Sequence, residues 1–255
     1  MLTKGTFLGA GLHGTTPSGT SAYFSVDVGV FHIAALSTQN PKGEELAWLI
    51  ADLAAATAPE QRKKVPWVIA TSHYPIYSPT MDDHAHCSAR AYESVEGEIA
   101  DPSAVYRTCE ENGEAADCTT VGDMVKATKG LEKVLMKYGV DIWNAGHVHD
   151  YQVTWPIVNG TAPNQHYKDP QGPVYITEGN GGVPGVPAAH KFMNVSQQWG
   201  RIHGTGGAYG ILTASDAGRL QYDHVWNNGN SGTGEIMETW AIERSAPHLA
   251  RVLSK

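Results

Sequence analysis

The sequence predicts an α/β domain, in which helices alternate with the strands of a central sheet. Three short apolar runs, residues 67–70, 140–143 and 174–177, have the length and continuity of buried strands. Residues 44–56, before the first run, and residues 121–138, between the first and the second, carry apolar side chains at helical spacing. Twenty-eight glycines and fourteen prolines indicate many turns and long loops, which is typical of an α/β or β-rich protein rather than a helical bundle.

The first third of the chain predicts a hairpin followed by a helix. Residues 1–21 are rich in Gly, Thr and Ser and predict an irregular segment. Residues 23–28 and 31–36 are apolar runs separated at Gly29, which predicts a β-hairpin. The helix over 44–56 has one apolar face, made of Leu46, Leu49, Ile50 and Leu53.

The remaining elements follow the same periodicities. The helix over 121–138 is expected to stop at Gly139. Two segments, 74–120 and 183–206, predict long loops, and such loops are often functional. The last predicted strands are 209–213, 219–225 and 236–242. With no linker or repeat, we expect one domain over 22–245 and a tail over 246–255.

Charge and hydropathy exclude several classes of function. The net charge of −8 disfavours nucleic acid and anionic membrane surfaces as partners. The densest basic patch, Arg62-Lys63-Lys64, is expected at the end of a helix. No run of eighteen apolar residues predicts a membrane span, and the first residues lack the apolar centre of a signal peptide.

Three histidines follow predicted strands. His73 comes after the run 67–70, and His147 and His149 come after the run 140–143. Ligands collect beyond the carboxyl ends of strands in open α/β sheets. Side chains two apart on an extended segment point the same way, so His147 and His149 are a natural pair for metal ions. The alternative is a pair of surface or hydrogen-bonded histidines. Gly146 lets the backbone approach an ion closely.

A second cluster lies in the polar loop 74–120. It contains Asp82, Asp83, His84 and His86. One interpretation is a second functional cluster near the first, which includes His84 and His86. The alternative is a solvated loop without a function in catalysis.

Several blocks, in order, resemble the purple acid phosphatases of the calcineurin-like metallophosphoesterase superfamily. They cover most of residues 22–230, and the combination of an H-x-P block with a later G-H-x-H block is specific. The blocks are 23–29, 48–53, 66–78, 139–142, 146–151 and 173–182.

The resemblance implies the C-terminal half of an α-β-β-α sandwich that hydrolyses phosphate monoesters at acidic pH. A metal-bound hydroxide attacks at a dinuclear centre of Fe with Fe, Zn or Mn. The resemblance places His73 and His147 on one ion and His149 on the other. It places His84 and His86 over the phosphate, where they hold it and protonate the leaving oxygen. It also implies a secreted, vacuolar or lysosomal location.

The family's carboxylate ligands precede the block at residue 23, so we expect them to be missing from this chain. Asp150 and Asn180 depart from the family pattern, and neither replaces a bridging aspartate. The alternative function is therefore a truncated, non-catalytic relative with a single weak histidine-only site, best suited to zinc, that acts as a binding module. An exposed sheet face is expected to favour a homodimer.

Two further features concern the secretory pathway. Asn159 and Asn194 begin N-x-[ST] sequons and are candidate glycosylation sites. Cys109 and Cys118 flank an acidic loop and form a disulfide if the compartment is oxidising, which leaves Cys87 odd.

Overall fold

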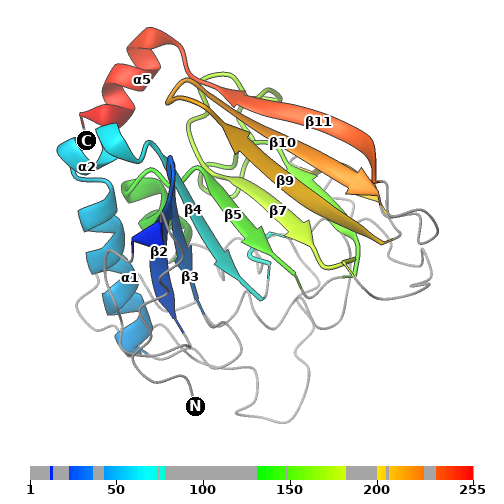
Figure 1. Cartoon of the computed structure of the whole chain (residues 1–255), viewed down its shortest axis with the longest axis horizontal. Coiled ribbons are helices and arrows are strands. Elements are labelled where there is room, and N and C mark those ends of the chain that lie inside the picture. The colour runs from blue at the N-terminus through cyan, green and yellow to red at the C-terminus, as the bar shows by residue number, and fades with distance from the viewer. Residues whose placement is uncertain are drawn as a thin grey trace.

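The molecule is built from two stacked β-sheets with helices on one side (Figure 1). The computed structural model describes residues 12–13, 23–36, 43–73, 75–77, 131–146, 149–181, 200–204, 207–226 and 234–254. Within these ranges the larger sheet has eight strands in the order β1-β2-β3-β4-β5-β7-β6-β8, and the smaller has three in the order β11-β10-β9. The chain therefore contains both sheets of the predicted sandwich.

The larger sheet is mixed. Strands β3, β4, β5 and β7 are mutually parallel, whereas β2 and β1 at one side and β6 and β8 at the other are antiparallel to their neighbours. Its strands are β1 (Leu12–His13), β2 (Phe24–Val28), β3 (Phe31–Ala35), β4 (Trp67–Ser72), β5 (Ile142–Ala145), β6 (Tyr151–Thr154), β7 (Val174–Glu178) and β8 (Gly200–Gly204). Parallel neighbours bring their carboxyl ends to one edge, which is where a site is expected.

Helices cover one face of the larger sheet. They are α1 (Gly43–Ala56), α2 (Pro59–Lys64) and a helical segment over 131–137. The apolar stripe of α1 packs on the sheet, with Leu49 and Leu53 fully buried against Val68 and Ala70 of β4. The alternate residues of β4 face the other way, as the two-residue period of a strand requires.

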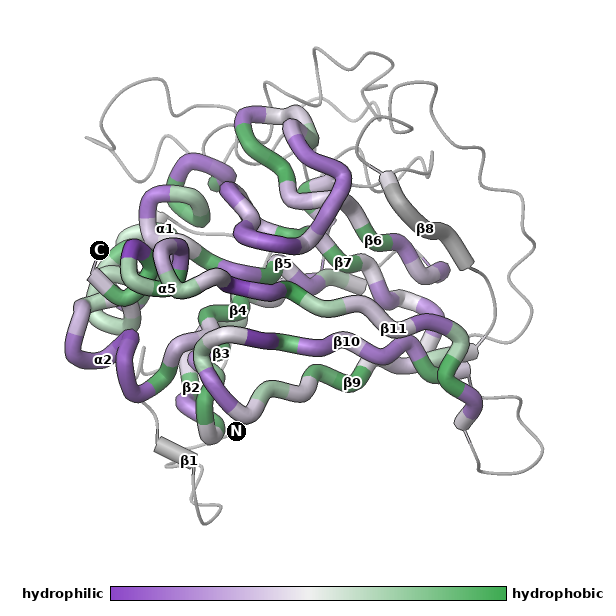
Figure 2. The backbone as a smooth tube through the Cα atoms, turned by 90° about the horizontal axis from the view of Figure 1, so that it is seen from above, coloured by the Kyte–Doolittle hydropathy of each residue, from purple (hydrophilic) through white to green (hydrophobic). Residues whose placement is uncertain are grey.

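The smaller sheet covers the opposite face. It consists of β9 (Ala208–Ala214), β10 (Arg219–Trp226) and β11 (Glu235–Glu243), and Figure 2 shows these strands as a separate layer beside the larger sheet. Apolar side chains of both sheets form one buried cluster, which includes Trp67, Ile142, Ile176, Leu220 and Ile242. The two sheets thus pack face to face, and their facing apolar side chains form a core between the two layers.

Most predicted elements are present, and five differ. Helix α2 (Pro59–Lys64) lies beyond the helix predicted over 44–56. The predicted tail contains helix α5 (Ala246–Leu253), which contacts α2, and the predicted irregular segment 1–21 contains the short strand β1. Strand β6 was not predicted, because its alternate residues Gln152 and Thr154 are polar although buried. Strand β8 lies within the loop predicted over 183–206. No helix among the described residues is long and apolar enough to cross a membrane.

Exposed apolar side chains lie mainly on the smaller sheet. On β9 and β11 the most exposed are Tyr209, Ile211, Ile236 and Met237. The central strands of the larger sheet are covered on both faces by the two apolar clusters. The predicted homodimer therefore stays a prediction, and the smaller sheet rather than the larger one offers an apolar surface for it.

A buried histidine joins the hairpin to α1. His32 of β3 is fully buried, and its ring nitrogens lie 2.7 Å from Asp27 Oδ1 and 2.9 Å from Asp52 Oδ2. Ser25 donates to the other oxygen of Asp52 at 2.5 Å. Burial alone lowers the pKa of His32, but hydrogen bonds to the two carboxylates and their negative charge raise it to about 9.

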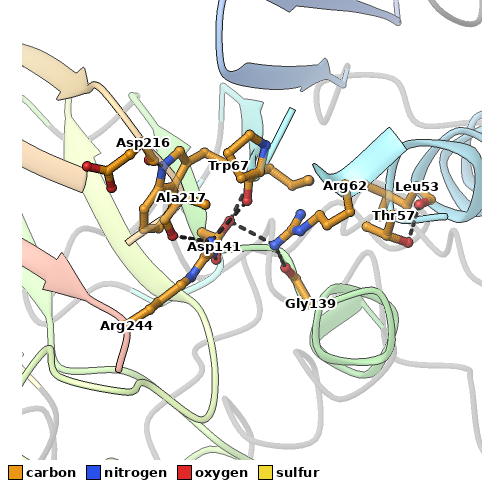
Figure 3. Close-up of polar contacts among 11 residues, drawn as sticks. Leu53, Thr57, Arg62, Trp67, Gly139, Asp141, Asp216, Ala217 and Arg244 are labelled. Carbon is orange, nitrogen blue, oxygen red and sulfur yellow. Dashed lines mark hydrogen bonds and ion pairs between the residues drawn. The ribbon is translucent and has the colours of Figure 1, made fainter. Parts of the chain in front are cut away.

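A buried ion cluster lies at the amino end of β5 (Figure 3). Asp141 Oδ2 lies 3.0 Å from Arg62 Nη2 of α2, and Oδ1 contacts Arg244 Nη2, just after β11. Asp141 Oδ2 also accepts the backbone N–H of Val68 at 2.9 Å. The guanidinium of Arg244 lies over the ring of Trp67, 3.7 Å from its centroid. The Arg62-Lys63-Lys64 run forms the last turn of α2, as predicted, and the Arg62 side chain is buried, where it pairs with Asp141.

We predict that the fold becomes less stable at alkaline pH, because His32 loses its charge and with it the two ion pairs. A raised pKa means that this stabilisation is complete below pH 6.5 and is lost as the pH rises through 9. The free energy of unfolding, measured in urea, is expected to fall by ~3 kcal/mol over that window. In His32→Gln this loss is absent. An identical pH dependence in the two proteins would contradict the assignment.

We predict that Asp141→Asn destabilises the protein by about 3–5 kcal/mol, because two buried guanidinium groups lose their counter-charge. The measurement is urea unfolding at pH 6.5. The matched control is Glu243→Gln, which removes an exposed pair with Arg219 (2.7 Å) and is expected to cost less than about 1 kcal/mol. If both variants lost the same free energy of unfolding, the buried cluster would stabilise the fold no more than an exposed ion pair does.

Candidate functional site

Four strands of the larger sheet bring polar residues to one edge. The parallel strands β4, β5 and β7 end there, at Ser72, Ala145 and Glu178. Strand β6 is antiparallel to β7, so its amino end lies at the same edge. The residues that follow β4 and β5 and precede β6 therefore lie along the same edge of the sheet, with β5 and β7 between β4 and β6. We call this place, marked by His73, Gly146 and His149, the histidine edge.

The backbone of His73 is tied to the residue before His147. Ser72 of β4 is the register partner of Ala145 of β5, and the next residue, Gly146, donates its N–H to the carbonyl oxygen of His73 at 3.0 Å. The side chain of His73 is exposed. Among the described residues, a Cβ added to Gly146 would meet that same carbonyl oxygen at an ordinary 3.8 Å.

His149 stands just before β6 with its side chain exposed. The next residue, Asp150, is fully buried and accepts a hydrogen bond from Gln152 Nε2 at 2.7 Å. Its carbonyl oxygen accepts the N–H of Gly179, which follows β7, at 3.2 Å. The two neighbouring side chains thus differ in burial, exposed at His149 and buried at Asp150. Asp150 therefore contributes no carboxylate to the exposed edge.

Several predicted site residues lie outside the described part of the chain. They are His84, His86, His147, Asn194, Cys87, Cys109 and Cys118. Within the described ranges, no group of three His, Cys, Asp or Glu side chains is arranged to hold a metal ion. Two of the three predicted ligands, His73 and His149, are thus brought to the same edge, and the third remains a prediction.

The described donors fit an ion of borderline hardness. Exposed imidazoles suit zinc and similar ions, and they need no rearrangement of the core to bind one. A second, harder ion needs oxygen ligands. The described carboxylates nearest the edge, Asp150 and Glu178, are already hydrogen-bonded inside the protein. His73 and His149 are therefore exposed nitrogen donors of the type that such an ion accepts.

A polar network behind the edge was missed by the sequence analysis. The carboxylate of Glu178 accepts the hydroxyl of Tyr222 and lies 2.8 Å from Nδ1 of His224. Tyr151, at the start of β6, stacks on the ring of His224 with centroids 3.8 Å apart. The signal was present in the sequence. Val174, Ile176 and Glu178 alternate along β7, so the carboxylate had to face the same core as the two apolar residues.

Comparisons with known proteins agree with this geometry. No protein-family model matches the chain. It is 27% identical to purple acid phosphatase 21 of Arabidopsis thaliana over 241 residues, which cover 92% of this chain. It is 30% identical to purple acid phosphatase 23 of the same plant over 65% of this chain, and 27% identical to acid phosphatase type 7 of Danio rerio over 63%.

The chain is a relative of the purple acid phosphatases. It corresponds to the C-terminal part of their chains and spans less than half of their length: 44%, 26% and 34% of these three relatives. A solved purple acid phosphatase from yellow lupin seeds has the same fold, with a TM-score of 0.63 and 21% identity over 89% of this chain and 34% of that one. The predicted fold class, a metallophosphoesterase-type α/β sandwich, is confirmed.

Proposed function

We propose that the histidine edge is the nitrogen-donating part of a metal centre that hydrolyses phosphate monoesters, as in an acid phosphatase. The observation that carries the proposal is the hydrogen bond from Gly146 to His73, since it joins the two sequence blocks that contain the predicted ligands. The relatives named above are purple acid and acid phosphatases. Activity, metal and substrate of the whole protein are inferred from this combination.

In the proposed site, His73, His147 and His149 hold the metal through neutral imidazole nitrogens. We infer a pair of ions, Fe with Fe, Zn or Mn. When bound, such ions polarise the phosphoryl oxygens and supply a nucleophile from water at mild pH. His84 and His86 are proposed to orient the phosphate and to donate a proton to the leaving oxygen, which a histidine does best when the pH is acidic.

The second candidate function is a binding module with one histidine-only site. It is favoured by the engagement of Asp150 and Glu178 in internal hydrogen bonds, because no described carboxylate at the edge then remains to balance two close cations. Such a site would bind a single zinc ion and leave phosphate esters intact. Stoichiometry of bound metal separates the two functions.

We predict metal-dependent hydrolysis of p-nitrophenyl phosphate that depends on both exposed histidines. His73→Ala and His149→Ala are each expected to lower the rate and the metal affinity about 100-fold or more, while both fold normally because their side chains are exposed. The assay is run with added iron, zinc or manganese, on this chain and on any longer product of the same gene. Bound metal is measured in parallel.

His166→Ala is the matched control, since His166 is also exposed but lies in the loop after β6, away from the edge. It is expected to retain full activity and metal. One bound ion without turnover favours the binding module. Hydrolysis or metal binding that survives in both His73→Ala and His149→Ala would rule out the proposed site.

We also propose that Asn159 carries an N-linked glycan in a secreted or vacuolar protein. Asn159 is exposed on the turn between Val158 and Thr161, and its φ of 51° is one that asparagine tolerates. The hydroxyl of Thr161 donates to the carbonyl oxygen of Val158 at 2.9 Å. The sequon is therefore presented at the surface.

We predict that the chain, expressed through a eukaryotic secretory pathway, loses mass on treatment with an N-glycosidase. Thr161→Ala removes the Asn159 sequon without altering the backbone of the asparagine, and it is expected to abolish the glycan at that position. A variant of the second sequon, Asn194→Gln, serves as the control. Mass spectrometry that finds Asn159 unmodified in the secreted protein would contradict the proposal.

A further inference from the structure

A network of side chains connects the two sheets directly behind the histidine edge. We name it the Glu178 network, after the last residue of β7, and it includes Tyr151, Tyr222 and His224. Glu178 has one carboxylate oxygen on the Tyr222 hydroxyl and the other 2.8 Å from His224 Nδ1. Both partners come from β10 of the smaller sheet, and all three side chains are buried by about nine-tenths or more. A single carboxylate thus fixes the end of β7 to the other layer.

Contacts of both its ring and its hydroxyl hold Tyr151, the first residue of β6. The ring of Tyr151 stacks on His224 at 3.8 Å, with an angle of 10° between the planes. Its hydroxyl donates to Glu238 at 3.0 Å and accepts Nε1 of Trp240 at 3.2 Å. Because Tyr151 comes two residues after His149, these contacts limit where the backbone of His149 can lie.

Backbone hydrogen bonds carry this restraint to the edge. Tyr151 and Glu178 are direct partners in the β6–β7 register. Just beyond them, the N–H of Gly179 donates to Asp150 at 3.2 Å, and the N–H of Ala208 in β9 donates to Asn180 at 3.4 Å. The segments that leave β7 and enter β6 are therefore fixed to each other and to the smaller sheet.

The smaller sheet is shaped to accept this contact. A Cβ added to Gly210 of β9 would overlap the Tyr222 hydroxyl and the Glu178 carboxylate. Burial raises the pKa of Tyr222 above its usual range, so its hydroxyl stays protonated and remains a donor at neutral pH. Gly210 leaves room for the close contact between the Glu178 carboxylate and the Tyr222 hydroxyl, and Tyr222 supplies the donor.

We propose that the Glu178 network positions the segment of His149 and thereby sets the affinity of the histidine edge for metal. The inference rests on the metal site proposed above. Residues that orient ligands from behind typically change metal affinity by about 10–100-fold when they are removed. Glu178, Tyr222 and His224 are thus positioning residues, acting through Tyr151 and the backbone of Asp150.

The test compares two buried tyrosine hydroxyls that each donate one hydrogen bond. Tyr222 donates between the two layers, and Tyr167 donates within the connection from β6 to β7. Tyr222→Phe removes the hydroxyl at the edge, and Tyr167→Phe removes one that donates to the carbonyl oxygen of Thr154 at 3.0 Å, at the far end of β6. Zinc affinity is measured by titration. Hydrogen exchange of the Gly179 and Ala208 amides is measured without metal, and unfolding midpoints are recorded for both variants.

Tyr222→Phe is expected to bind zinc about tenfold more weakly and to exchange the Gly179 amide about tenfold faster than wild type. Tyr167→Phe is expected to match wild type in zinc affinity and in exchange of the Gly179 amide, even if its unfolding midpoint falls. Glu178→Gln, which keeps one acceptor oxygen, should fall between wild type and Glu178→Ala. If Glu178 variants do not fold, Gly210→Ala provides a second disruption of the same contact.

Equal effects of Tyr222→Phe and Tyr167→Phe, or none in either, would overturn the positioning role. If wild type binds no zinc, the metal site itself is contradicted. The exchange rates then test only whether the Glu178 network restrains the backbone at the edge. Faster exchange at Gly179 only in Tyr222→Phe would then support its control of the edge. Unchanged exchange in that variant would refute it.

Discussion

The buried carboxylate of Asp141 neutralises guanidinium groups from two distant parts of the chain. Arg62 approaches from α2 and Arg244 from the end of β11, 79 and 103 positions away. The same carboxylate accepts the N–H of Val68, so it also sets β4 against β5. Removal of that one charge would leave two buried cations unpaired, which costs several times more than loss of an exposed pair. The placement of β4 and β5, and with it of the histidine edge, depends on this cluster.

The two sheets are thus joined by different interactions at the two ends of their central strands. The Asp141 cluster lies at the amino end of β5, and Glu178 lies at the carboxyl end of the neighbouring strand β7. Between them lies an apolar cluster with no charged member, which includes Ile142 and Ile176. Apolar burial favours contact between the layers without fixing their register, whereas directional polar contacts fix it. A site that needs ligands from several strands gains from such fixed register.

Much of this architecture follows from periodicity in the sequence. The alternation and length of the apolar runs predicted β4, β5 and β7, and their parallel arrangement placed His73 and Gly146 at one edge. The ion cluster could not be predicted in this way, because Arg62 stands in a run of cations that is typical of a helix end. Only the fold brings Asp141 beside it. Glu178 is intermediate, since alternation along β7 indicates an inward carboxylate but does not name its partner.

The central claim is that the histidine edge coordinates metal through imidazole nitrogens. X-ray absorption spectroscopy of the zinc-loaded chain tests it most directly, because the scattering pattern of imidazole identifies and counts histidine ligands. The site predicts histidine nitrogens at about 2.0–2.1 Å, with fewer of them per zinc in His73→Ala and in His149→Ala than in wild type. A spectrum unchanged by both substitutions, or one dominated by sulfur at about 2.3 Å, would contradict it.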